Sequence, residues 1–246
     1  MKQGDLINVF LRSLFIQASL NFRGMQSLGF AFAIAPVVKR FGSDKPRVAG
    51  VLTRHLQSFN THPYLAGSII GAVAHIEETL DAENDDAEAV ALKNVLMGPY
   101  AAIGDSFFWG SLKPFAAIFG VLIAMQGFLA APVIFLFLYN PPHLWVRLKG
   151  FIEGYRKGKQ GIDFIRMLDM PGIARKLRSI SPVLLGILAA VISETACHSL
   201  GSFRYDLPAK LAALIVTIVL FQIIRKGFST LGILYGMFIL FCLISL

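Results

Sequence analysis

Polar side chains that could bind a neutral polar solute gather in a short stretch of an otherwise apolar sequence. This stretch, QSFNTHP, holds Gln57, Asn60, Thr61 and His62. Amides, hydroxyls and imidazoles together offer both donors and acceptors, which a polar solute needs. Pro63 disfavours helical geometry at the residue before it and suits the first position of a new helix. The stretch therefore predicts a helix break whose unpaired backbone groups could also bind solute; the alternative is that Asn60 and Thr61 only cap helices.

A second candidate stretch, MGPYAAIGDSFFWGSLKP, covers residues 97–114. Interior glycine costs a helix about 1 kcal/mol and proline about 3 kcal/mol, so the stretch predicts short helical pieces joined by irregular backbone. Such backbone survives at membrane depth only where protein or a water-filled cavity satisfies it. This favours a solute site with Asp105 as a polar contact and Phe108 and Trp109 as stacking surfaces. The alternative is that Asp105 caps a helix starting at Ser106 and the aromatic rings pack in the core.

The remaining reactive residue types show no catalytic or metal-binding pattern. The histidines have no HExxH spacing, cysteine partner or Glu-x-x-His pair, and there is no GxxxxGK[ST] phosphate loop. The acidic stretch from Glu77 to Lys93 lacks the glycine and terminal glutamate of a calcium loop, so we expect a solvated loop with a helix start. Cys197 and Cys242 lie in apolar segments and are expected to be inert. The sequence predicts no catalytic residue, cofactor or metal.

Composition places these stretches in a membrane protein. The chain has 246 residues, of which 55% are hydrophobic and 15% charged, and its mean hydropathy is +0.64. This predicts an all-α integral membrane protein with several transmembrane helices plus broken or re-entrant and amphipathic helices. The net charge of +8 comes from Lys and Arg beside apolar segments, which argues against nucleic acid binding. We expect one domain over residues 1–246, with its N-terminus retained because no signal-peptide pattern is present.

The first part of this domain, residues 1–114, is expected to hold the amphipathic and broken helices. Within it, residues 5–21 repeat apolar side chains every three or four positions. That amphipathic helix could lie in the membrane interface, dock on a partner subunit or cover its own domain.

The second part, residues 115–246, is expected to hold transmembrane helices. Residues 115–139 would extend about 37 Å as a helix, enough for one tilted crossing of a hydrocarbon core of about 30 Å. The basic loop 144–179 is predicted to be cytoplasmic. Apolar segments 181–197, 211–224 and 228–246 then place the C-terminus outside. Glu194, in the first of these segments, is either functional or interfacial.

Three long motifs point to a known family. They are NFRGMQSLGFAFAIAP from Asn21, RHLQSFNTHPYLAGSIIGAVAHIEE from Arg54 and LMGPYAAIGDSFFWGSLKP from Leu96. In these motifs the chain resembles the enzyme IID membrane subunit of the mannose, fructose and sorbose family of the bacterial sugar phosphotransferase system (PTS). The likeness covers nearly the whole chain, but the connection from Ser199 to Pro208 is shorter than in the family.

The resemblance implies a non-catalytic subunit of the bacterial inner membrane that pairs with a membrane IIC protein. Cytoplasmic IIA and IIB phosphocarriers would phosphorylate the imported hexose, which would be mannose, glucose, fructose or a related sugar. The family also implies a moving domain and a scaffold domain in the lipid bilayer, assembled as a trimer of IIC–IID pairs. The motif residues Gln57, Asn60, Thr61 and His62 would line or support the sugar path at the IIC interface, with Asp105 and Trp109 close by.

Two other functions compete with this interpretation. A self-contained secondary transporter would move solute without IIC or phosphoenolpyruvate, although few buried ionisable residues are available for ion coupling. A non-transporting membrane adaptor would fill its polar helix breaks with side chains of a neighbouring subunit.

Overall fold

The computed structural model describes residues 1–79, 87–199 and 206–244. The named elements in these ranges are all helical, which agrees with the predicted all-α fold. They are α1 (Gln3–Ser13), α2 (Ser27–Val38), η1 (Lys39–Phe41), α3 (Lys45–His55), α4 (Ala66–Thr79), α5 (Ala87–Gly104), η2 (Asp105–Leu112), α6 (Lys113–Met125), α7 (Ala131–Lys157), η3 (Gly158–Ile162), α8 (Asp163–Met167), α9 (Met170–Ser199), α10 (Asp206–Arg225) and α11 (Thr230–Ile244).

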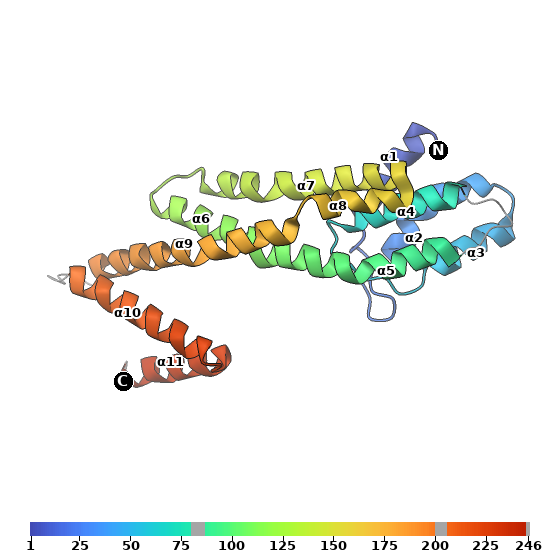
Figure 1. The fold of residues 1–246 in the computed structure, drawn as a ribbon. Coiled ribbons are helices and arrows are strands. Elements are labelled where there is room, and N and C mark those ends of the chain that lie inside the picture. Colours follow the sequence, from blue (N-terminus) through green and yellow to red (C-terminus); the bar gives the residue numbers. More distant parts are fainter. Residues whose placement is uncertain (80–86, 200–205, 245–246) are drawn as a thin grey trace.

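Helices α1 to α8 form an elongated bundle, from which α9 leaves as a long arm that leads to α10 and α11 (Figure 1). Helix α4 lies at the centre of the bundle, with all residues from Ala66 to Ala74 buried. It packs backbone to backbone on α7, since a Cβ on Gly71 would lie 2.3 Å from Phe151 O and one on Gly154 would lie 2.4 Å from Ser68 O. Small residues therefore set the close α4–α7 approach.

The predicted single span over residues 115–139 is wrong. Helix α6 ends at Met125, and a turn with Gly127 at φ +82° leads into α7, which begins at Ala131. Helix α7 continues past Pro141 and Pro142 to Lys157, so the region is a helical hairpin. Hydropathy missed this turn because the segments on both sides of it are apolar; the marks of the turn are Gln126 and a glycine able to adopt positive φ.

The predicted irregular backbone in residues 97–114 is also wrong. Pro99 lies inside α5, and η2 continues the helix as an eight-residue π-helical segment into α6. Residues 87–125 thus form a helix of 39 residues, the one helix in the described ranges long and apolar enough to cross a membrane. Asp105 caps no helix because the chain is already helical before it. A π-helical segment is a wider helical turn that often occurs at functional sites.

The acidic region is less exposed than expected. Glu77 lies in the last turn of α4 and is 1% exposed, and its carboxylate binds Arg54 and His55, the latter with 2.7 Å between Nε2 and Oε1. The solvated loop predicted from Glu77 is therefore wrong at its first residue, because α4 carries this carboxylate into the bundle. Part of that prediction, residues 80–86, lies outside the described residues, and α5 starts at Ala87.

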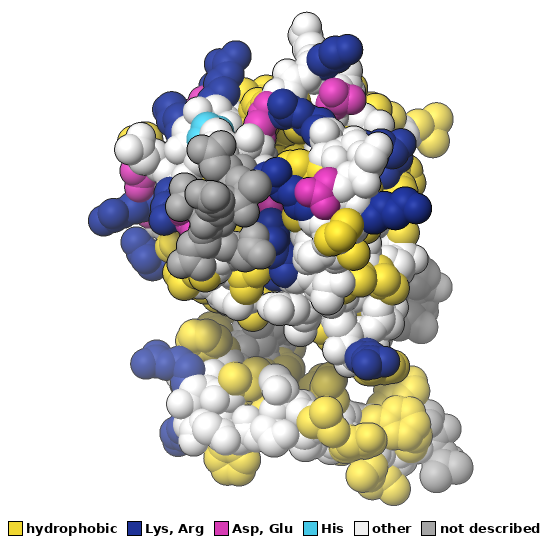
Figure 2. Space-filling model, turned by 90° about the vertical axis from the view of Figure 1, so that its right-hand side faces the viewer, with side chains coloured by type: hydrophobic (Ala, Val, Ile, Leu, Met, Phe, Trp, Pro, Cys, Tyr) yellow, Lys and Arg dark blue, Asp and Glu magenta, His cyan; other side chains and the backbone are white. Residues whose placement is uncertain are grey.

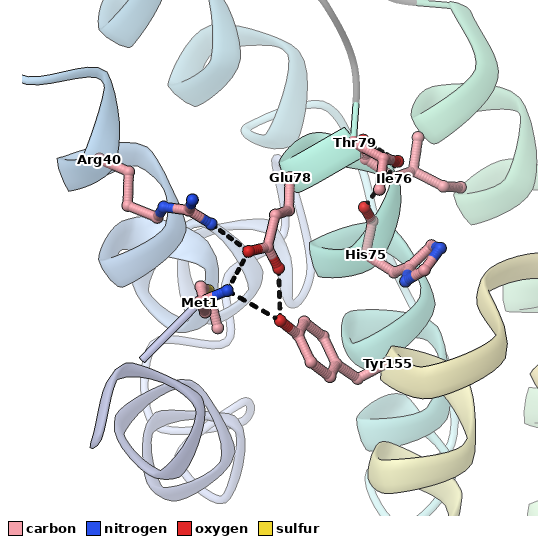
Figure 3. Close-up of polar contacts among 7 residues, drawn as sticks. All are labelled: Met1, Arg40, His75, Ile76, Glu78, Thr79 and Tyr155. Atoms are coloured by element: carbon pink, nitrogen blue, oxygen red, sulfur yellow. Dashed lines mark hydrogen bonds and ion pairs between the residues drawn. The ribbon is translucent and has the colours of Figure 1, made fainter. Parts of the chain in front are cut away.

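Glu78 of α4 binds the chain's first residue and one residue each of η1 and α7, as Figure 3 shows. Its carboxylate accepts hydrogen bonds from the Met1 ammonium, from Arg40 of η1 and from the Tyr155 hydroxyl of α7. Partial burial raises the pKa of Glu78, but these hydrogen bonds lower it by a larger amount. The pKa therefore falls from its ordinary value of 4.5 to about 2. The cluster ties the ends of α4 and α7 to the N-terminal segment.

Other helix boundaries differ from the sequence predictions in detail. Helix α1 ends at Ser13, so the amphipathic helix predicted over residues 5–21 is shorter. Residues 144–179 are mostly helical, since they contain the end of α7, η3, α8 and the start of α9. The three C-terminal apolar segments fall in α9, α10 and α11 as predicted. Glu194 is exposed on α9 and Cys242 is half-buried on α11, while the side chain of Cys197 is outside the described residues.

Candidate functional site

The predicted helix break is present between α3 and α4. Helix α3 ends at His55 and α4 begins at Ala66, and residues 57–62 between them are called the break segment below. Its backbone runs beside Gly24 and Gln26, which precede α2. Gln26 N donates to Phe59 O at 2.8 Å, and Phe59 N donates to Gly24 O at 3.3 Å.

The side chain of Gln26 continues this pairing by two more hydrogen bonds. Its Nε2 donates to Thr61 O at 2.8 Å, and its Oε1 accepts from Thr61 N at 3.0 Å. Sequence reasoning did not select Gln26 as a site residue, although it lies in the motif NFRGMQS. The first motif therefore serves as a template, because its residues pair with the backbone of the second motif. This pairing holds in place a segment that has no helical hydrogen bonds of its own.

His62 is where the break segment meets the π-helical segment η2. Its ring is 1% exposed, stacks on Phe108 at 5.2 Å between centroids and lies 4.6 Å from the Trp109 ring. A Cβ on Gly104 would lie 2.3 Å from the His62 side chain, so glycine makes room for the ring. His62 Nδ1 accepts a hydrogen bond from Tyr64 N at 3.2 Å, which assigns the proton to Nε2.

Two buried polar atoms in the break segment have no hydrogen-bond partner among the described residues. They are His62 Nε2 and Thr61 Oγ1. Leaving such an atom unsatisfied costs about 1–3 kcal/mol. Most buried polar groups in native proteins are paired, so these two atoms mark a place where a bound molecule, water or partner subunit would be favourable.

The structure separates the six predicted site residues into two groups. Thr61 and His62 are buried. The others present their side chains at the surface: Gln57, Asn60, Asp105 and Trp109. The His62 ring makes the direct contact between the two motifs, because it packs against both Phe108 and Trp109. The predicted proximity of the two stretches is therefore real, and it is created by the aromatic rings.

Three side chains of α7 pack around Tyr64 and extend this region. They were not among the site residues predicted from the sequence. Tyr64 OH lies 3.1 Å from Tyr139 OH, and the His143 ring stacks on Tyr64 at 4.3 Å between centroids. The guanidinium of Arg147 lies 4.6 Å from the Tyr64 ring centroid, while its Nε is buried without a partner within the described part of the chain. The four-residue spacing of Tyr139, His143 and Arg147 puts them on one helix face, and that spacing was a signal available in the sequence.

Comparison with known proteins identifies the kind of protein that carries this site. The family model described as "PTS system mannose/fructose/sorbose family IID component" matches residues 1–246. The chain belongs to this family. The mannose-specific EIID component of Escherichia coli K12 is 30% identical over 259 residues, covering 98% of this chain and 92% of that protein. The sorbose-specific EIID component of Klebsiella pneumoniae is 30% identical, covering 96% and 93%.

Solved structures agree with this assignment. One described as "Structure of membrane protein" has a TM-score of 0.74 at 30% identity, covering 97% of this chain and 94% of that chain. A cryoEM structure of the mannose transporter ManYZ in complex with microcin E492 has a TM-score of 0.60 at 30% identity and the same coverage. The resemblance stated from the motifs is thus confirmed. This IID component is an all-α membrane protein of a PTS sugar-transport family.

Proposed function

We propose that this IID component forms, together with a membrane IIC subunit, the path for uptake of a hexose that IIA and IIB phosphorylate. The observation that supports it best is the pair of unsatisfied buried atoms, His62 Nε2 and Thr61 Oγ1, beside the half-exposed ring of Trp109. A donor, a hydroxyl and an aromatic face together suit a sugar, which has hydroxyl groups on its edge and C–H groups on its faces.

The six predicted residues have distinct roles in this proposal. The exposed side chains of Gln57, Asn60 and Asp105 supply hydrogen bonds toward the sugar or the IIC subunit. The unsatisfied Thr61 Oγ1 and His62 Nε2 offer further hydrogen-bonding groups in the wall behind these side chains, and Trp109 offers a stacking surface. The chain itself contributes no catalytic residue, since phosphoryl transfer belongs to IIA and IIB.

The names of the relatives support a hexose, but they differ in which hexose they name. Their names specify mannose, sorbose or, for a Bacillus subtilis permease component at 28% identity, fructose. We therefore propose mannose, glucose, fructose or a related sugar as the substrate class.

The charge distribution supports a cytoplasmic location for one end of the bundle. Figure 2 shows Lys and Arg gathered over the end that carries the N-terminus. Elements at this end include η1, the start of α3, the end of α7 and η3; their exposed cations include Arg40, Lys45, Lys157 and Lys159. By the positive-inside rule this end faces the cytoplasm, together with much of the region 144–179, and the C-terminus lies outside. The proposed assembly is a trimer of IIC–IID pairs in the inner membrane bilayer, and we propose no nucleic acid partner.

Reconstituted transport tests the function. Vesicles containing the cognate IIC, IIA and IIB are supplied with phosphoenolpyruvate and labelled hexose, with or without this chain. Hexose phosphate should accumulate only when the chain is present. Equal accumulation without it would favour a membrane adaptor, and uptake by this chain without IIC or phosphoenolpyruvate would favour a secondary transporter.

Single substitutions test the site within the same assay. Asn60→Ala and Asp105→Ala should each abolish most uptake while the protein still inserts into the membrane. Asn94→Ala is a matched control, because Asn94 is an exposed residue of α5 outside the two motifs. Normal uptake by Asn60→Ala or Asp105→Ala would remove that residue from the proposed site.

A further inference from the structure

Lys93 is a fully buried cation in the middle of α5. Its side chain is 0% exposed, and its Nζ donates a hydrogen bond to Gln57 O at 3.2 Å. The ammonium also faces two aromatic rings, at 5.2 Å from the Phe30 centroid and 5.8 Å from the Phe59 centroid. Lys93 therefore joins α5 to the first residue of the break segment.

The contacts described for Lys93 include no carboxylate. The nearby buried acid, Glu77, binds Arg54 and His55 instead. A buried ion carries a desolvation penalty of several kcal/mol. A hydrogen bond to a charged group returns about 1.5–3 kcal/mol and cation–π contacts about 0.5–2 kcal/mol. An apolar side chain of similar shape in place of Lys93 would therefore stabilise this core at least as much as Lys93 does.

We propose that Lys93 is a positioning residue that fixes the Gln57 end of the break segment and thereby aims Asn60 toward the sugar. Gln26 fixes the other end of the same segment at Thr61. Asn60 lies between these two anchors, so its direction depends on both. The role of Lys93 in sugar binding depends on the function proposed above, whereas its role in anchoring the segment does not.

Cysteine accessibility tests the anchoring directly. Cys197 and Cys242 are replaced by serine, and Thr61→Cys is introduced at a position that is 4% exposed in this chain. In membranes with IIC, Lys93→Met should raise the labelling rate of this cysteine by a water-soluble maleimide at least about tenfold, because the segment opens locally. Lys93→Arg, which keeps a charged donor, should restore slow labelling.

A second buried position separates local from global loosening. Ser68 is 2% exposed on α4, so Ser68→Cys should stay slow to label in the Lys93→Met background. Unchanged labelling at Thr61→Cys would overturn the proposal. Equal acceleration at both positions would also overturn it, because Lys93 would then be a general structural residue.

Stability and transport kinetics complete the test. Lys93→Met should leave the thermal unfolding temperature unchanged or higher, since it removes a desolvated charge. The KM for hexose uptake should rise about tenfold with Vmax nearly unchanged, because the binding group is misplaced. A lower unfolding temperature with an unchanged KM would overturn the positioning role. Absence of hexose uptake by the unsubstituted complex would refute the proposed function, but the labelling result would still report on the anchor.

Discussion

Gln26 binds both backbone groups of Thr61 with its side-chain amide, donating from Nε2 at 2.8 Å and accepting at Oε1 at 3.0 Å. Both residues are buried, at 2% and 4% exposure. The amide thus replaces a neighbouring strand for a segment that lies between two helices. This pairing connects two motifs through residues that are 35 positions apart, and it explains why a polar side chain occupies the core near the start of α2.

Substitution of Gln26 should destabilise the protein. Gln26→Leu leaves the N–H and C=O of Thr61 buried without partners, and each costs about 1–3 kcal/mol. Thermal unfolding in detergent should show a clear loss of stability for this variant. Gln126→Leu, in the exposed turn after α6, should change stability by less than about 0.5 kcal/mol. Equal stability of the two variants would contradict the template role of Gln26.

Gly104 should tolerate no side chain. The added Cβ of Gly104→Ala would lie 2.3 Å from His62 Cβ and Cγ, so His62 or η2 must shift. Overpacking of this kind costs about 1–3 kcal/mol, and the shift should also reduce hexose uptake.

Gly98→Ala is the matched control for Gly104→Ala, because its added Cβ would meet no heavy atom within 4 Å apart from its chain neighbours and the backbone of its own helix. It should stabilise α5 by up to about 1 kcal/mol through helix propensity. His62→Gly removes both the Cβ and the Cγ that the added methyl group would meet, so Gly104→Ala should cost less stability in a His62→Gly background than beside His62, while uptake stays low. An equal loss of stability in the two backgrounds would show that the His62 contact is not the cause.

Loss of the Glu77 carboxylate should be costly. Glu77→Gln breaks the ion pair with Arg54 and weakens the hydrogen bond with buried His55, which should lower the unfolding free energy by about 3 kcal/mol or more. Glu153→Gln removes a carboxylate held by two exposed lysines, Lys149 and Lys157, and should cost much less stability than Glu77→Gln. Chemical denaturation of both variants measures the difference, and similar losses would refute the special role of the buried pair.

Glu78 should make stability fall at acidic pH. Its folded pKa is about 2 against an ordinary value of 4.5, so the folded state favours the ionised form. The stabilisation is fully present above about pH 4.5 and is lost as pH falls toward about 2. Thermal unfolding followed across this window should show a weaker pH dependence for Glu78→Gln.

Glu88→Gln is the corresponding control for the pH experiment. Glu88 is 42% exposed and pairs with Lys159, which is 59% exposed, so its removal should leave the pH dependence nearly unchanged. An equal weakening of the pH dependence in Glu78→Gln and Glu88→Gln would show that Glu78 is not a particular cause of the loss of stability in acid.

The sequence by itself determined the class of protein, the family and the position of the main helix break. Composition sufficed for the membrane class because burial in lipid requires apolar residues. The family followed from three long motifs. The break at residues 57–62 was readable because Pro63 acts on the geometry of its immediate neighbour, a local effect that needs no tertiary information.

Tertiary structure decided what depends on contacts between distant residues. The hairpin turn at Gly127 left Gln126 as its polar signal, too little to reveal a turn within an apolar segment. The π-helical segment η2 keeps helical a stretch whose glycines and prolines predicted interruption. Burial of Glu77 and Lys93 was equally unreadable, because a charged side chain enters a core only when partners from other helices meet it. Whether His62 faces Trp109 rather than Asp105 was likewise fixed by packing, with Gly104 providing the space.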